Sequence, residues 1–115
     1  MILNKIKEAL EGTGLTGCYI TRRNNPLPCV VYSYTSLPKS NADNVIDTIE
    51  YTVLCNILVV EDIENSKKTV MDSFLKHGFI CKEIRATEFI ELGSFFNTPI
   101  IFKIILKVRY KYEKS

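Results

Sequence analysis

The sequence predicts an α+β fold, in which an antiparallel-rich mixed sheet of four to five strands carries two helices on one face. Two segments repeat their apolar residues at the spacing of a helix, and two longer segments alternate apolar and polar residues at the period of a strand. The expected order is helix, two or three strands, a long strand, helix, and then two or more strands. Grouped strands of this kind favour an antiparallel-rich sheet covered by helices on one side.

The length and composition fit one folded domain. The chain has 115 residues, so residues 1–115 are expected to form a single domain with its own core. The formal charge of +2 is too small to indicate nucleic acid, and no specific nucleic-acid recognition is expected. Charged residues interrupt the apolar ones from the start, and no run reaches the roughly 20 apolar residues of a membrane helix. We therefore expect no signal peptide and no membrane partner.

The first half of the chain contains a helix followed by strands. Apolar residues recur at helical spacing over residues 2–12, until glycines end the pattern. Residues 17–23 are compatible with a short strand, and β-branched and aromatic residues predict a strand over 29–35. Turn-forming residues dominate 36–44, which predicts a loop.

A long strand and a second helix follow. Over residues 47–60 every second residue is apolar, which places one face of a strand in the core. The expected core residues of this strand are Ile49, Tyr51, Val53, Cys55, Ile57 and Val59. Acidic and capping residues at 61–66 then precede a helix with an apolar stripe, which Gly78 ends.

The last third predicts two more strands. Residues 79–84 fit a strand, and residues 86–97 fit either strand or loop. Residues 100–112 alternate apolar and basic side chains, except that Ile101 and Ile105 fall on the basic face. A strand this long exceeds the usual five or six residues. Either it bends across the domain, or its end projects beyond the core.

The cysteines do not indicate a metal site. Cys18, Cys29, Cys55 and Cys81 form no Cys-x-x-Cys pair, and His77 is the only histidine. We expect four reduced thiols, most of them acting as small buried hydrophobes, and neither a disulfide nor a cofactor.

No motif predicts catalysis. Residues 12–17 match the Gly-x-Gly-x-x-Gly fingerprint, but a helix precedes them and a strand follows, the reverse of a dinucleotide site. His77 stands at a helix end, where it is expected to cap carbonyl groups. Glu83, Glu88 and Glu91 could form an acid–base pair, yet such a grouping is typical of a solvated edge. We therefore do not expect an enzyme.

The charges are unevenly distributed along the chain. Residues 40–66 contain six acids and no Lys or Arg, whereas residues 101–115 have a net charge of +4. The two regions could neutralise one another as neighbouring strands of one sheet, or they could meet between subunits in a head-to-tail contact. The candidate interface residues are Lys39, Asp43, Asp47, Glu50, Lys103, Lys107, Arg109 and Lys111.

The layout resembles a known family. An extended proline segment leads into a strand at 25–32, a polar loop at 41–44 precedes the long strand, a helix ends in Lys76-His77-Gly78-Phe79, and a long strand closes the fold. This arrangement, over nearly the whole chain, is similar to that of the tail-terminator or tail-completion proteins of long-tailed bacteriophages.

The resemblance implies a structural role in a virus particle. Such a protein has no enzymatic activity and no cofactor, and it forms a ring, most often a hexamer, that ends the tail tube and joins it to the head or neck. Its partners are copies of itself, the tail tube protein and the head or neck connector proteins. It is found in the bacterial host cytoplasm during assembly and then in the virion. The alternatives are a monomeric or dimeric binding module that uses a sheet edge, and a small enzyme acting through one of the three glutamates.

Overall fold

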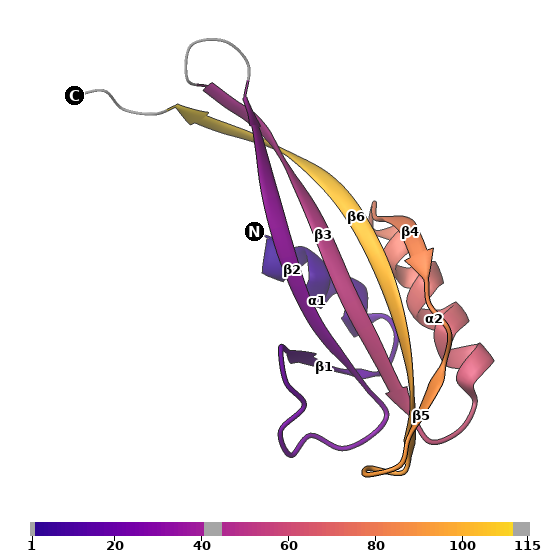
Figure 1. Ribbon diagram of the computed structural model, residues 1–115. Coiled ribbons are helices and arrows are strands. Elements are labelled where there is room, and N and C mark those ends of the chain that lie inside the picture. The colour runs from indigo at the N-terminus through magenta and orange to yellow at the C-terminus, as the bar shows by residue number, and fades with distance from the viewer. Residues whose placement is uncertain (1, 41–44, 112–115) are drawn as a thin grey trace.

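The computed structural model describes residues 2–40 and 45–111, and it describes side chains for residues 2–39 and 48–107 (Figure 1). The elements in chain order are α1 (Ile2–Glu11), β1 (Thr16–Tyr19), β2 (Cys29–Ser40), β3 (Val45–Val59), α2 (Ile63–Lys76), β4 (Ile80–Ile84), β5 (Glu88–Ile90) and β6 (Phe95–Lys111).

The predicted α+β class is confirmed. One six-stranded sheet has the order β1-β2-β3-β6-β4. β5 also pairs with β6, next to β4 along the same strand. Every pairing is antiparallel except β1 with β2, so the sheet is mixed. The structure has six strands where four to five were expected, and the shortest, β5, lies in the segment that the sequence left open between strand and loop.

Both helices pack on one face of the sheet, as predicted. The main core joins apolar residues of α1 and α2 to the alternating residues of β2, β3 and β6. At its centre, Phe74 of α2 stacks on Phe102 of β6 with a centroid distance of 4.4 Å. Of the six core residues expected in the long strand, five are buried and Ile49 is partly buried against the same core. The period of two in β3 therefore identified the face that the helices cover.

The expected loop at 36–44 is wrong in its first half. β2 continues to Ser40, and its register with β3 places Leu37 beside Glu50 and Pro38 beside Ile49. Pro38 fits because alternate residues of β2 direct their backbone groups away from β3. Tyr32 is one of these, and its carbonyl accepts from Ile20 N–H on the β1 side at 2.8 Å. A proline in this phase removes no bond of the β2–β3 ladder, so pairing with a long neighbour overrode the turn-forming composition. Residues 41–44 lie outside the described part of the chain.

Two smaller expectations also change. β1 ends at Tyr19 rather than near residue 23, because Ile20 adopts a positive φ of 72°. Asp62 occupies the N-cap position of α2, but its side chain makes no capping hydrogen bond there. The start of α2 is thus acidic without the side-chain cap that the sequence suggested.

The long final strand both bends and projects. β6 has 17 residues, and Figure 1 shows it curving along its length and reaching, with β2 and β3, beyond the ends of both helices. We call this end of the three strands the arm, and its described side chains are those of residues 35–39, 48–51 and 103–107. At its base, Tyr51 and Ile104 are still buried in the main core, and Lys103 still pairs with β4.

The opposite end of the sheet has its own cover on the helix-free face. A small second core forms there around the buried residues Cys18, Cys29 and Leu58. The segment between β1 and β2 contributes to it, and the Arg22 guanidinium lies 5.4 Å from the centre of the Phe95 ring. The helix-free face is therefore covered at this end and open along the arm.

Candidate functional site

The arm presents a mixed apolar and basic surface on the helix-free face. Cross-strand register places Leu37, Glu50 and Ile105 in one row across β2, β3 and β6. Leu37 is 57% exposed and Ile105 is 52% exposed. Lys39 and Lys107 flank this row on the side of the arm tip, and Lys103 flanks it on the other. We call these six residues the arm patch.

Glu50 lies at the centre of the arm patch between two lysines. The Lys39 ammonium is 3.1 Å from Glu50 Oε1, and the Lys103 ammonium is 3.1 Å from Glu50 Oε2. Hydrogen bonds from Lys39 and Lys103 hold the pKa of the Glu50 carboxyl below its ordinary value of 4.5. Glu50 is thus paired with lysines of the two adjacent strands, which is the neutralisation within one sheet that the charge pattern suggested.

This arrangement predicts a pH dependence. Because the pKa of Glu50 is lower in the folded chain than in the unfolded one, its contribution to stability is present above the unfolded pKa and is lost as pH falls through the folded pKa. We expect an NMR titration to give the Glu50 carboxyl a pKa below its ordinary value of 4.5. Glu50→Gln should flatten the acid side of the stability profile, and a Glu50 pKa at or above the ordinary value would contradict the bridging geometry.

The remaining predicted interface residues are less fully placed. Lys107 is exposed, and it forms no ion pair with any of the described side chains, which are those of residues 2–39 and 48–107. Asp43 lies outside the described residues. The backbones of Asp47, Arg109 and Lys111 belong to the arm ends of β3 and β6, but their side chains lie outside the described set.

A second surface, the acidic corner, lies at the other end of the sheet, where β3 leads into α2. Its residues are Val60, Glu61, Asp62 and Glu64. Val60 is 55% exposed, and the three acids are exposed as well. Val60, Glu61 and Asp62 help to line a hollow of about 220 Å³, together with Pro28, Val59 and Ser66. In the sequence these acids formed part of a charge run and marked the start of a helix. The exposure of Val60 beside them, which the structure shows, makes this a surface of mixed chemistry.

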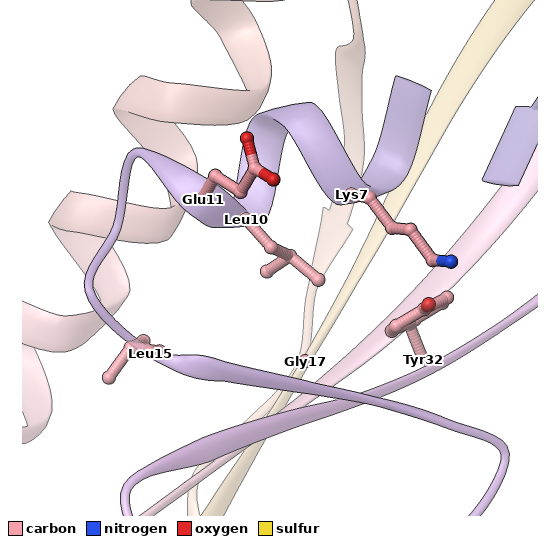
Figure 2. A pocket seen from close by; sticks show the side chains of 6 residues that line it. All are labelled: Lys7, Leu10, Glu11, Leu15, Gly17 and Tyr32. Atoms are coloured by element: carbon pink, nitrogen blue, oxygen red, sulfur yellow. The ribbon is translucent and has the colours of Figure 1, made fainter. Parts of the chain in front are cut away.

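A hollow of about 250 Å³ lies between α1 and the β1–β2 edge, lined by Lys7, Leu10, Glu11, Leu15, Gly17 and Tyr32 (Figure 2). Leu10 points from α1 toward β1, where a Cβ on Gly17 would lie 2.8 Å from Leu10 Cδ1. Gly17 therefore allows close packing of the helix on this strand. The charged side chains at this hollow, Lys7 and Glu11, have opposite signs and do not select a charged ligand.

The one histidine has the capping role that the sequence predicted. His77 is the C-cap of α2, and its Nδ1 donates to the Ser73 carbonyl at 2.8 Å. The neighbouring Ser73 hydroxyl donates to the Ala9 carbonyl across the α1–α2 contact, and Asp72 pairs with Lys68 at 2.8 Å. His77, Ser73 and Asp72 lie close together in sequence, but each bonds to a group of α1 or α2 and none of the three bonds to another's side chain.

The other candidate groups are dispersed. Glu83 pairs with Arg85 at 3.2 Å, and Glu88 and Glu91 are exposed. All four cysteines are free. Burial raises the pKa of the Cys55 thiol to about 12, and burial with the nearby Cys18 raises the pKa of Cys29 to about 11.

Within the described residues, no three potential metal ligands are grouped together. None of the described helices combines the length and the hydropathy that crossing a bilayer requires. The chain matches no protein-family model, and no curated protein matches it either.

Proposed function

We propose that this chain is a structural assembly subunit that forms a ring with copies of itself, most often a hexamer. In the setting implied by its resemblance to phage tail terminators, the ring ends the tail tube and joins it to the head or neck. The tail tube protein and the connector proteins are then its partners, and it passes from the host cytoplasm into the virion. It acts by shape and contact rather than by catalysis.

The arm is the observation that supports this function. Its three strands extend beyond both helices and expose Leu37 and Ile105 on one face. Its edges are also open: among the described residues, β1 flanks β2 only as far as Tyr32, and β4 flanks β6 only as far as Lys103. Exposed apolar side chains and open sheet edges are surfaces that soluble proteins cover when they assemble.

Light scattering on a size-exclusion column, over a range of protein concentrations, tests this proposal. We expect a closed ring of about six subunits whose population rises with concentration. Ile105→Ser should weaken the ring by removing an apolar contact of the arm. Leu92→Ser is the matched control, because Leu92 is fully exposed in the turn between β5 and β6. A monomer at every concentration would contradict self-assembly.

A monomeric binding module is the second candidate, and the open edge of β2 favours it. Tyr34 and Ser36 follow Tyr32 at every second residue, so their backbone N–H and C=O groups also point away from β3. They lie on the open edge of β2, where an added strand from a partner could pair with them. This function requires a monomer whose Tyr34 and Ser36 amide resonances shift when a partner peptide binds. Light scattering therefore distinguishes the two candidates.

A further inference from the structure

The arm patch is a positively charged apolar surface, and this chemistry restricts what can cover it. Among the described side chains of the arm, Lys39, Lys103 and Lys107 are accompanied by a single carboxylate, that of Glu50, so these four groups keep a positive balance after the two ion pairs form. Ile105 and Leu37 add apolar area between the cations. A complementary surface would offer apolar contacts together with carboxylates that have no basic neighbour of their own.

The acidic corner of the same chain has that chemistry. Its hollow has apolar walls from Pro28, Val59 and Val60, and two of its other lining residues are Glu61 and Asp62. Neither of these two acids forms an ion pair with a described side chain. Glu64 has one weak partner, Lys67, at 3.4 Å.

The two surfaces cannot meet within one chain. In the β3–β6 register, Val59 at the acidic corner pairs with Phe96, whereas Lys107 in the arm pairs with Thr48. The stretch of β6 from Phe96 to Lys107 spans roughly 36 Å at the rise of an extended strand. Figure 1 shows the corresponding ends of the sheet at opposite ends of the molecule, which is 54 Å long. Only a second copy can bring the acidic corner to the arm patch.

We propose that the arm patch of one copy docks on the acidic corner of the next, with Lys107 beside Glu61 and an apolar side chain of the arm over the hollow lined by Val60. This inference rests on the proposed function and specifies its contact. The contact joins two different surfaces, so it is head-to-tail, and it closes into a ring when the rotation between copies permits. It also assigns the acids of residues 40–66 two separate roles: Glu50 organises the arm within each chain, and the acids of the acidic corner bind the neighbouring copy.

Charge reversal and charge exchange test this contact. Lys107→Glu alone and Glu61→Lys alone should each raise the concentration at which the assembly is half-dissociated by about tenfold, because each places like charges together. The double variant, carrying both changes in one chain, should assemble nearly as well as the wild type, because the pair is restored with opposite polarity. Lys82→Glu and Glu8→Lys are matched controls, exposed on β4 and α1, and should leave assembly unchanged.

The outcomes separate this contact from the proposed function. A wild-type ring that is unaffected by either single reversal would overturn the contact and leave ring formation standing. Weakening by both reversals without recovery in the double variant would also overturn it, since the two residues would then act at different places. A wild type that stays monomeric would overturn both proposals. Thermal unfolding of each variant confirms that the fold is retained.

Discussion

Replacing Phe74 with alanine is expected to lower the free energy of unfolding by about 3–5 kcal/mol. Phe74 is fully buried, stacks on Phe102 at 4.4 Å, and meets the edge of Phe79 at 4.9 Å. It therefore joins α2 to β6 and to the residue that precedes β4 through one ring. Removing that ring loses its burial and leaves a cavity that three elements would have to collapse to fill.

Urea unfolding followed by circular dichroism measures this loss. The matched control is Leu75→Ala, one residue along the same helix, where the side chain is 48% exposed and the expected loss is no more than about 1 kcal/mol. A Phe74→Ala and Phe102→Ala double-mutant cycle should show a coupling of about 0.5–1.5 kcal/mol for the stacked pair. Equal losses at Phe74 and Leu75 would contradict the assignment of the buried face of α2.

The second large effect is expected at Ile6. Ile6→Ala should lower the free energy of unfolding by about 2–5 kcal/mol, because the side chain is fully buried in the main core. α1 has 10 residues, fewer than the roughly 12–15 that an isolated helix needs to be stable in water. Its helical structure therefore depends on its buried face, and losing Ile6 should loosen the whole helix.

Hydrogen exchange distinguishes local loosening from global unfolding. In Ile6→Ala, the α1 amides should exchange faster relative to those of β3, which lies between β2 and β6. Glu8→Ala, on the exposed side of the same helix, should leave both sets unchanged. If α1 and β3 amides accelerate equally, the helix and the sheet form one cooperative unit and the local-loosening prediction is wrong.

Much of the fold could be predicted from local patterns. The helical spacing from Ile2 to Leu10 and the alternation in β3 and β6 identified both the elements and their buried faces. Gly78, with a φ of 93°, ends α2 as its position after Lys76 and His77 indicated. These features depend on residues close together in sequence, so periodicity and backbone preference are sufficient to reveal them.

The candidate site required the tertiary structure. Composition alone assigned Pro38 to a loop, and only the register with Ile49 shows that it belongs to a strand. Likewise, Glu50 belonged to an acidic run until the sheet order placed a lysine on each side of it.

The sequence by itself therefore determined the class of the fold, its helices, its longest strands and the faces they bury. The tertiary structure decided that the basic and acidic surfaces lie at opposite ends of the sheet, with Lys107 at one end and Glu61 at the other. The physical reason is that side-chain periodicity is a property of a few neighbouring residues. Strand order, register and the distance between two charged surfaces arise from pairings between segments far apart in the chain.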